Sequence, residues 1–511
     1  MALMGFAIDN RLCIGCHACT VACKAEHSVP IGVNRTWVKY VEKGTFPHAS
    51  RSFSVQRCNH CDDAPCVEIC PVTSLFARPD GIVDFDPQRC IGCKACMQAC
   101  PYDAIYLDPN TLTAAKCNYC THRVDTGYEP ACVIVCPVEA ILSGDLDDPA
   151  SPISRLERHQ KVQYPRPEKA TNPKLFYVGG ETAALDPTAA PPEENYLWSG
   201  QAIAPGALEA ARREAEGESR AAAGPRRTYD ANEKPAPWGK LVSAYITTKA
   251  ISAGTVMVSL ILYLFGDNAT VLPAVPGIIS LLFLVVTGAL LIADLKQPKR
   301  FMYILLRPQW KSWLVRGAYV ILAFSPLLAA ALFVSGFGAP PGAQLAIGGL
   351  AGLMAVPTAA YTALLLAQAK GRDYWQNPLL MVTMLFDALV AGTAVVSLIG
   401  AAPLRWGWDG GLLCDWARYG MAACAATQAA LLACEFLPAH ATRGAADAAR
   451  IITRGVYRRH FWWGVVTAGV ALPFVVSLAT NQVVLPAAAL LAGIAMKNHV
   501  LVQAPQRVPL R

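Results

Sequence analysis

Four groups of four closely spaced cysteines are the part of this sequence best suited to binding metal. They take up sixteen of the nineteen cysteines. Two groups have the spacing C-x2-C-x2-C-x3-C, one has C-x2-C-x4-C-x3-C and one has C-x2-C-x11-C-x3-C. Clustering of this kind favours metal binding over disulfide bonds. The groups are Cys13, Cys16, Cys19 and Cys23; Cys58, Cys61, Cys66 and Cys70; Cys90, Cys93, Cys96 and Cys100; and Cys117, Cys120, Cys132 and Cys136.

The last cysteine of such a group has a role of its own. The stretch "CIGCKACMQACP" ends in a cysteine followed by proline. In the bacterial ferredoxin run, the fourth cysteine binds the other cluster of a pair. We therefore expect Cys100 to reach across to a partner cluster, and the sixteen cysteines to hold four [4Fe–4S] clusters. Zinc is the alternative, but zinc sites use pairs of closely spaced cysteines rather than triplets with a displaced fourth.

Residues 5–178 resemble the four-cluster electron-transfer subunit of molybdoenzyme complexes of the DMSO reductase and polysulfide reductase type. Besides the four groups, the resemblance rests on "CNHCDDAPCVEICP", "GIVDFDPQRCIGC" and "GDLDDPASPISRL". It implies that the first group pairs with the fourth and the second with the third. The ligand sets would then be Cys13, Cys16, Cys19 and Cys136; Cys23, Cys117, Cys120 and Cys132; Cys58, Cys61, Cys66 and Cys100; and Cys70, Cys90, Cys93 and Cys96.

The same resemblance implies an order for the clusters and a partner for the protein. The cluster at Cys13 would face a catalytic subunit that carries molybdopterin (or tungstopterin). The cluster at Cys58 would face the membrane. Four clusters in a row would relay electrons, and their potentials would depend on hydrogen bonding and exposure.

The rest of the chain supplies the elements that must position these cysteines. Of its 511 residues, 54% are hydrophobic and only 16% are charged, below the usual quarter. The deficit of charge lies after residue 240, where long apolar runs begin. The division predicts an α+β ferredoxin-like four-cluster domain at 1–178, a linker rich in Ala, Pro and Glu at 179–240, and an all-α eight-helix transmembrane bundle at 241–511. The net charge of +7 does not suggest nucleic acid.

Eight apolar runs are long enough to cross the hydrocarbon core of a membrane, which takes about 20 helical residues. They lie near 243–265, 271–294, 312–336, 343–368, 378–401, 411–437, 460–479 and 483–503. The loops on the cluster side hold fourteen Lys and Arg residues, and those on the other side hold one, Arg405. By the positive-inside rule, this predicts a multi-pass protein of the bacterial inner membrane with its cluster domain in the cytoplasm.

The stretch "LLIADLKQPKRFMYILLRPQWKSW" resembles the loop between the second and third helices of the quinone-reactive anchor of the same complexes. The resemblance implies quinone or quinol as substrate within membrane lipid, and no haem. Ionisable residues in spans are functional candidates, and quinone chemistry needs groups that exchange protons. For each candidate, snorkelling or a helix-end charge is the alternative. Lys249 is the first choice, and the full set is Lys249, Asp294, Arg300, Asp387, Glu435 and His499.

These features predict an electron-transfer and membrane-anchor subunit without substrate chemistry of its own beyond the quinone. It would link a cytoplasmic molybdopterin subunit to the quinone pool, with oxidation of an inorganic sulfur compound such as sulfite as the preferred direction. A quinol-oxidising subunit of a DMSO, polysulfide or thiosulfate-type reductase is an alternative. A redox-driven proton-translocating module and a membrane-tethered ferredoxin are two further ones.

Overall fold

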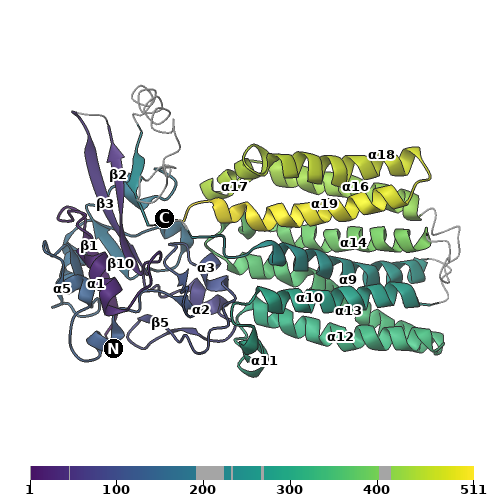
Figure 1. The fold of residues 1–511 in the computed structure, drawn as a ribbon, viewed down its shortest axis with the longest axis horizontal. Coiled ribbons are helices and arrows are strands. Elements are labelled where there is room, and N and C mark those ends of the chain that lie inside the picture. Colours follow the sequence, from purple (N-terminus) through teal and green to yellow (C-terminus); the bar gives the residue numbers. More distant parts are fainter. Residues whose placement is uncertain are drawn as a thin grey trace.

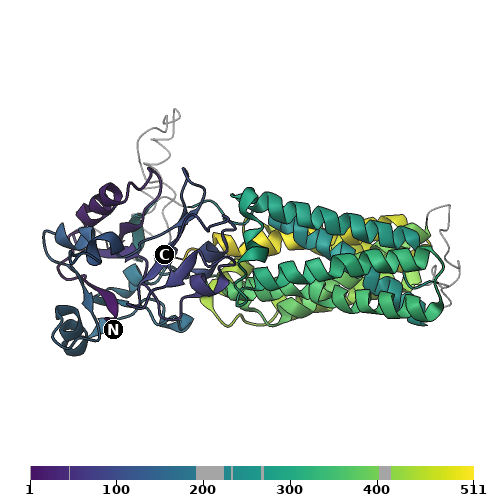
Figure 2. The same ribbon diagram turned by 90° about the horizontal axis from the view of Figure 1, so that it is seen from below.

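The computed structural model describes residues 2–44, 47–190, 224–231, 234–265, 270–401 and 416–510. They form an elongated molecule with a mixed helix-and-strand part at one end and a bundle of long helices at the other (Figure 1). A view turned by 90° shows the same two parts joined end to end (Figure 2). The chain ends near the boundary between them. The predicted fold class, a cluster-type α+β domain followed by a helical membrane region, is confirmed.

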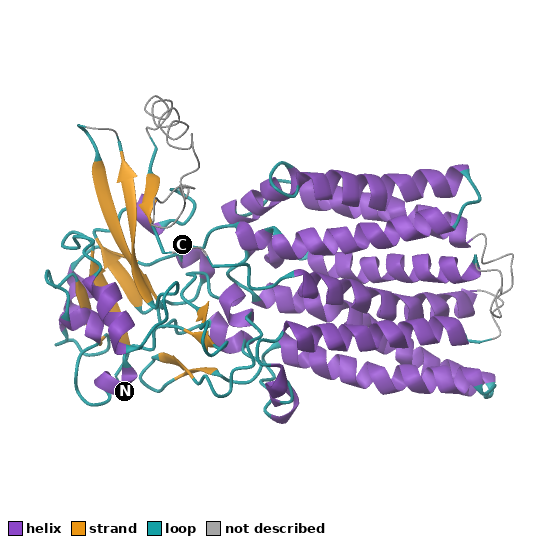
Figure 3. Cartoon of the chain, viewed as in Figure 1, coloured by secondary structure: helices purple, strands orange, loops and turns teal. Residues whose placement is uncertain are grey.

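Two sheets frame the N-terminal part (Figure 3). The strands are β1 Met4–Asp9, β2 Thr36–Lys43, β3 Ser50–Arg57, β4 Leu75–Ala77, β5 Val83–Phe85, β6 Tyr106–Leu107, β7 Ala114–Ala115, β8 Ile141–Asp145, β9 Val162–Gln163, β10 Leu175–Val178 and β11 Arg226–Tyr229. The larger sheet has the order β8-β1-β10-β9, in which β1 is parallel to β10 and antiparallel to β8. The smaller is antiparallel in the order β11-β2-β3, and β4-β5 and β6-β7 are separate pairs.

The helices of this part are short, and most of them follow cysteine-bearing loops. They are α1 Ala18–Glu26, α2 Pro65–Ile69, α3 Ala95–Ala99, α4 Thr121–Val124, α5 Ala131–Ile134, α6 Pro152–His159 and α7 Thr182–Leu185, with a 3-10 turn at Pro167–Lys169. Helices of this length are not stable alone. Burial holds them in place: Ile69, Ala95 and Ala99 belong to one apolar core that also contains most of the cysteines.

The second part of the molecule is a bundle built mainly of long helices. Its helices are α9 Lys240–Phe265, α10 Ala274–Asp294, α11 Tyr303–Leu306, α12 Trp313–Gly336, α13 Pro341–Gln368, α14 Leu379–Gly400, α16 Met421–Phe436, α17 Arg443–Thr453, α18 Leu472–Ala479 and α19 Val484–Gln503. The π-helical segments Trp416–Gly420 and His460–Ala471 precede α16 and α18, and 3-10 turns lie at Pro298–Arg300, Asp373–Gln376 and Pro505–Arg507.

Seven helices within the described residues are long and apolar enough to cross a membrane. They coincide with seven of the eight predicted spans. The remaining one, predicted at 411–437, begins outside the described residues. Its described part runs from the π-helical segment Trp416–Gly420 through α16.

Helices α9 and α14 form the centre of the bundle. In the most apolar stretch of each of these two helices, 67% of the residues are buried inside the protein, whereas 22% are buried in the corresponding stretch of α12. Gly254 and Gly392 allow this close approach, because a Cβ on Gly254 would lie 1.7 Å from the carbonyl oxygen of Ala388. Small residues are the usual means of close helix packing in membranes. The outer helices are left to face lipid.

The segment predicted as a linker, 179–240, contributes to the fold where it is described. Helix α7 lies in it, and its strand β11 pairs with β2 in the smaller sheet. Trp238, just before α9, is buried. Residues 191–223 and 232–233 of this segment lie outside the described residues.

Candidate functional site

The two loops with ferredoxin-type spacing, 13–19 and 90–96, share one backbone conformation. Their glycines, Gly15 and Gly92, have φ of 71° and 68°. Two residues later, His17 and Lys94 have φ of 62° and 63° and lead directly into α1 and α3. Glycine adopts the left-handed region without steric cost. Residues 13–19 line a small cavity, and the shared conformation makes us expect the loop 90–96 to curve in the same way.

Two of the four implied ligand sets line a small cavity each. The walls are mainly apolar, with Val38, Val55 and Ile141 around one cavity and Val83, Tyr102 and Ile105 around the other. The cysteines lining the first are Cys13, Cys16, Cys19 and Cys136, and those lining the second are Cys58, Cys61, Cys66 and Cys100.

The other two sets are also brought together. Cys23 lies close enough to Cys120 and Cys132 for their charges to interact, and Cys117 lies within the same kind of range of Cys23 and Cys132. At the opposite end of the domain, Cys96 is close to its three set members, Cys70, Cys90 and Cys93. In all four sets, therefore, cysteines distant in sequence become neighbours in the fold.

The surroundings of these sulfurs fit iron–sulfur clusters. Burial raises the pKa of Cys61 to about 12 and that of Cys100 to about 11. Four thiolates in such a setting need a cationic body between them, which a cluster supplies together with one-electron transfer. Within the described residues, no His, Cys, Asp or Glu group converges closely enough to hold one metal ion. The sulfurs instead surround a space, as ligands of a larger body do.

Backbone amides point at several of these sulfurs. Ser74 N–H donates to Cys70 Sγ at 3.2 Å, Ala114 N–H to Cys90 Sγ at 3.4 Å, and Ala140 N–H to Cys136 Sγ at 3.3 Å. Hydrogen bonds of this type stabilise negative charge on cluster sulfurs.

The four sets form a row. Cys19 of the first set lies near Cys132 of the second. Cys117 of the second lies near Cys58 of the third, and Cys66 of the third lies near Cys96 of the fourth. The row starts at the end of the molecule that is distant from the bundle, where α1 lies, and finishes at α2 and α3 beside the long helices (Figure 1).

The prediction that the Cys58 set faces the membrane is wrong, because the Cys70 set lies there. The loops that carry the Cys70 set bond directly to the bundle. Ser312 donates to the carbonyl oxygen of Ile69 at 2.7 Å, and Lys296 N–H donates to that of Gly92 at 3.3 Å. The Cys58 set is the next set along the row, farther from the bundle, and Tyr102 lines its cavity.

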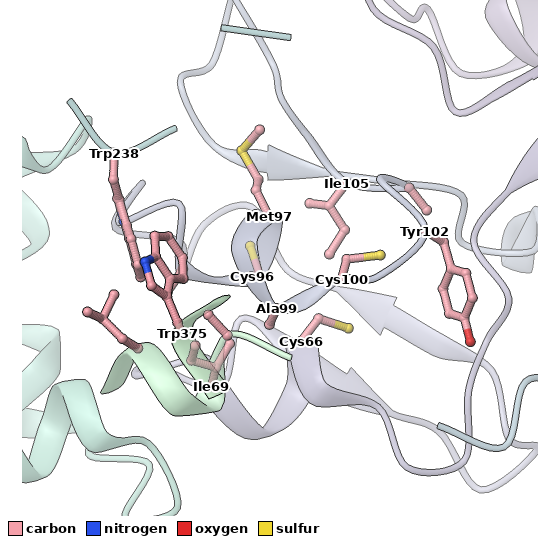
Figure 4. Close-up of a cluster of buried hydrophobic side chains, with 14 of the residues drawn as sticks. Cys66, Ile69, Cys96, Met97, Ala99, Cys100, Tyr102, Ile105, Trp238 and Trp375 are labelled. Atoms are coloured by element: carbon pink, nitrogen blue, oxygen red, sulfur yellow. The ribbon is translucent and has the colours of Figure 1, made fainter. Parts of the chain in front are cut away.

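A pair of tryptophans fills the junction between the Cys70 set and the bundle. Figure 4 shows the indoles of Trp238 and Trp375 side by side next to Cys96, with Cys66 and Cys100 beyond it. The ring centroids are 5.5 Å apart. Trp238 Nε1 donates to the carbonyl oxygen of Cys93 at 3.1 Å, and Trp375 Nε1 donates to that of Leu501 at 2.9 Å. The pair thus connects a cysteine loop to the last helix, α19.

Charged residues fasten the same junction. Lys94, between two cysteines of the Cys70 set, forms a 2.9 Å ion pair with Asp294 at the end of α10. Arg300 donates to the carbonyl oxygen of Cys90 at 3.0 Å. Two of the six predicted functional residues, Asp294 and Arg300, therefore hold the cluster domain against the membrane region.

The loop that follows α13 packs against the third cysteine group. A Cβ on Gly371 would lie 2.5 Å from the carbonyl oxygen of Gln98 and 2.8 Å from that of Cys100. Its neighbour Arg372 is buried, which lowers its pKa to about 10. Arg372 donates to Gln98 Oε1 at 3.0 Å and to the carbonyl oxygen of Val508 at 2.7 Å, and so joins both parts of the chain.

Lys249 lies inside the bundle, only 1% exposed. Its Nζ donates to the carbonyl oxygen of Ala359 at 3.1 Å and to the hydroxyl of Thr362, and lies 4.3 Å from the centroid of the Tyr361 ring. Tyr245, one turn earlier on α9, is close to Tyr361 and to Asp294. Amine, hydroxyl and phenol groups are thus concentrated in the end of the bundle that faces the Cys70 set.

Asp387 lies on α14, which packs against α9. Its carboxylate forms a 2.8 Å ion pair with Lys497 of α19, and both side chains are at most 10% exposed. Lys497 is not among the residues predicted from the sequence, although a lysine in an apolar run is the same signal that singled out Lys249.

The remaining two predicted residues stand apart from both. Glu435 accepts a 2.7 Å hydrogen bond from the hydroxyl of Tyr374. The His499 ring lies 6.1 Å from that of His460 and 6.2 Å from that of Tyr457. The six predicted residues are therefore distributed over several places and do not form a single site.

Comparison with protein families agrees with this division of the chain. The family described as "Polysulphide reductase, NrfD" matches residues 229–509, more than half of the chain. Two families described as "4Fe-4S dicluster domain" match residues 12–75 and 49–146.

Similar proteins carry the same iron–sulfur part. A subunit of the tetrathionate reductase of Salmonella typhimurium is 42% identical over 184 residues, which cover 35% of this chain and 74% of that protein. A component of the polysulfide reductase of Wolinella succinogenes is 40% identical over 187 residues, 36% of this chain and 97% of that protein. The iron-sulfur subunit ArrB of arsenate respiratory reductase from a Shewanella species is 33% identical over 223 residues, 34% of this chain and 95% of that protein.

The resemblance predicted from the sequence is confirmed. The cysteine sets, the dicluster matches and the apolar helices describe an iron–sulfur, multi-pass membrane protein. The chain belongs to the NrfD family of polysulphide reductase membrane proteins and carries a 4Fe-4S dicluster subunit in the same polypeptide.

Proposed function

We propose that this protein transfers electrons between membrane quinone and a catalytic oxidoreductase subunit, through four [4Fe–4S] clusters bound by its sixteen clustered cysteines. The observation that carries the proposal is the row of cysteine sets that ends at Trp238 and Trp375. Electron transfer needs closely spaced relays, and the sets are near neighbours throughout. A domain that only anchored a ferredoxin would not need its final cluster loops built into the bundle by hydrogen bonds.

The catalytic subunit would bind at the far end of the row. Cys16 is exposed there, and large apolar side chains beside it are also exposed. Ile14 is 56% exposed, and Ile134 of α5, which packs against α1, is 53% exposed. Exposed apolar groups around a redox centre fit a protein partner better than water. By analogy with the reductase relatives, we propose a molybdopterin (or tungstopterin) subunit as this partner.

Quinone would react near Lys249. Oxidation of a quinol releases two electrons and two protons, so the site needs a group that takes up protons close to the last cluster. Lys249 Nζ, buried between Thr362 and the Tyr361 ring, can hold or release a proton at a quinone oxygen. Tyr245 and Asp294 continue the polar path toward the Cys70 set. We propose that bound lipid-soluble quinone contacts this group.

We propose that electrons run from quinol to the partner. The relatives are named as parts of tetrathionate, polysulfide and arsenate reductases, so reduction is favoured over the sulfite oxidation predicted from the sequence. The basic loops lie on the cluster side of the bundle, which favours a cytoplasmic cluster domain.

The decisive experiment is purification of the complex from native membrane, followed by metal analysis and quinol oxidation. We expect about sixteen irons per chain, as four [4Fe–4S] clusters require, together with a partner that carries molybdenum or tungsten. Quinol should reduce the clusters rapidly. Lys249→Met should slow this step while the iron content is kept, and Lys249→Arg should slow it less.

Lys240→Met is the matched control, because Lys240 is an exposed lysine on the same helix. If Lys249→Met and Lys240→Met reduce their clusters at the wild-type rate, the quinone does not react at Lys249. Zinc in place of iron would end the electron-transfer proposal. Rapid reduction of the clusters by sulfite and the partner, with quinone as acceptor, would reverse the direction.

A second function, proton translocation coupled to quinone chemistry, is favoured by the buried pair of Asp387 and Lys497. Ionisable residues at such depth mark proton paths in pumps and transporters. The test is proton uptake by proteoliposomes during quinol oxidation. Translocation should disappear in Asp387→Asn while quinol oxidation continues; unchanged uptake would leave the pair with a structural role only.

A further inference from the structure

A buried arginine stands between the first two cysteine sets. Arg57, the last residue of β3, is 1% exposed. Its Nη1 donates to Cys132 Sγ at 3.1 Å, and its guanidinium carbon lies 4.5 Å from the centroid of the Phe6 ring. Cys19 of the first set and Cys117 of the second are also within range of its charge. The guanidinium thus faces sulfurs of two sets at once.

The hydrogen-bonding groups of Arg57 are not all used by protein atoms. Nε and Nη2 are buried and have no hydrogen-bond partner in the described part of the chain. Among the described residues, no carboxylate forms an ion pair with it. An unpaired buried charge with free donors is strongly unfavourable. The guanidinium therefore requires negative charge and acceptors in the neighbouring cavities, which bound clusters with their sulfides provide.

Two buried lysines near the row of cysteine sets, Lys94 and Lys116, differ from each other in how their charge is balanced. Lys94, beside the Cys70 set, is neutralised by Asp294 at 2.9 Å. Lys116 is fully buried and donates only to carbonyl oxygens, those of Val83 and Cys117. Among the described residues, Arg57 and Lys116 therefore have no carboxylate ion pair, whereas Lys94 is balanced by Asp294.

We propose that Arg57 is a fixed counter-charge that raises the reduction potential of the cluster held by Cys23, Cys117, Cys120 and Cys132, and so makes this position an electron reservoir between the membrane end and the catalytic partner. The proposal rests on the proposed function, because it requires bound clusters. Reduction adds negative charge to a cluster, and a nearby cation in a medium of low dielectric favours that state. Hydrogen bonds from Nε and Nη2 to sulfide would act in the same direction.

The experiment is a redox titration of the whole purified chain, followed by EPR at low temperature. Arg57→Gln removes the charge and keeps a polar N–H donor on a shorter side chain. Arg57→Lys keeps the charge but loses the planar set of N–H donors of the guanidinium. We expect the midpoint potential of one cluster to fall in Arg57→Gln by more than in Arg57→Lys, with iron content kept. The matched control is Arg51→Gln, since Arg51 lies on the same strand and its side chain is 53% exposed.

Three results overturn the proposal. Unchanged potentials in Arg57→Gln with full iron content would show that the charge is not felt by any cluster. A shift of equal size in Arg51→Gln would show a non-specific effect of net charge. Arg57→Gln could lose iron while Arg57→Lys keeps both its iron and the wild-type potentials. In that case the deciding variant is Arg57→Met, prepared at lowered temperature so that it keeps its iron. Wild-type potentials in Arg57→Met would refute the proposal. Absence of iron from the wild-type chain would instead refute the proposed function.

Discussion

The ion pair between Asp387 and Lys497 makes the sharpest stability prediction. The two side chains are 5% and 10% exposed, and their N–O distance is 2.8 Å. Asp387→Leu leaves the lysine charge buried without a partner, which costs about 3–5 kcal/mol in the interior of a protein. Translocon scales give a similar penalty of about 2.5–3.5 kcal/mol for a charge at the centre of a membrane helix. We therefore expect a loss of about 3 kcal/mol, roughly a hundredfold in the unfolding equilibrium.

Lys497→Met should cost about the same, because it leaves the carboxylate alone. The double variant Asp387→Leu/Lys497→Met should lie within about 1 kcal/mol of the wild type, since it removes both charges together. The assay is SDS titration in mixed micelles, read as a double-mutant cycle. Single variants that lose less than about 1 kcal/mol, or effects that simply add in the double variant, would refute the reasoning.

Three further predictions follow from the geometry. Gly254→Ala should destabilise the bundle by about 1–3 kcal/mol or prevent its assembly, because the added Cβ would overlap Ala388. Gly288→Ala should be neutral, because its Cβ would meet nothing within 4 Å, and thermal unfolding midpoints distinguish the two variants. Cys100→Ala should lower the iron content by about one cluster, from about sixteen to about twelve irons per chain, because Cys100 lines the cavity of the Cys58 set. Cys424→Ala, a control in the membrane region, should leave the iron content unchanged, and equal iron in both variants would contradict the assigned ligand set. Trp238→Phe should slow reduction of the clusters by quinol, measured by stopped flow, without loss of iron, because it removes the hydrogen bond to Cys93 and leaves a smaller ring against Trp375. A wild-type rate would remove the tryptophan pair from the electron path.

Much of the candidate site could be predicted from local sequence patterns. The spacing of the cysteine groups made iron–sulfur binding predictable, because three sulfurs of a set come from one tight loop whose glycine and helix start are local features. The apolar runs likewise defined seven spans, since the length needed to cross a membrane is fixed by its thickness.

What depended on long-range packing was not predictable in this way. Lys497 and Asp387 are 110 positions apart, and nothing in either local stretch shows that they meet. The set that faces the membrane is decided by contacts such as Trp238 to Cys93, 145 positions away. From its place in a span, Asp294 was predicted to exchange protons. In the structure it forms an ion pair with Lys94 on a loop distant in sequence and so joins the two parts of the molecule.

Strand β11 has a consequence for the order in which the protein is made. It is the last described element before the first span, and it completes a sheet with β2 and β3, which are made much earlier. All sixteen clustered cysteines and this closing strand therefore leave the ribosome before any membrane helix does. Domains generally fold as units during synthesis, N-terminal ones first. We expect the N-terminal domain to be folded when α9 reaches the membrane, so that each later hairpin of helices inserts against a surface that is already formed.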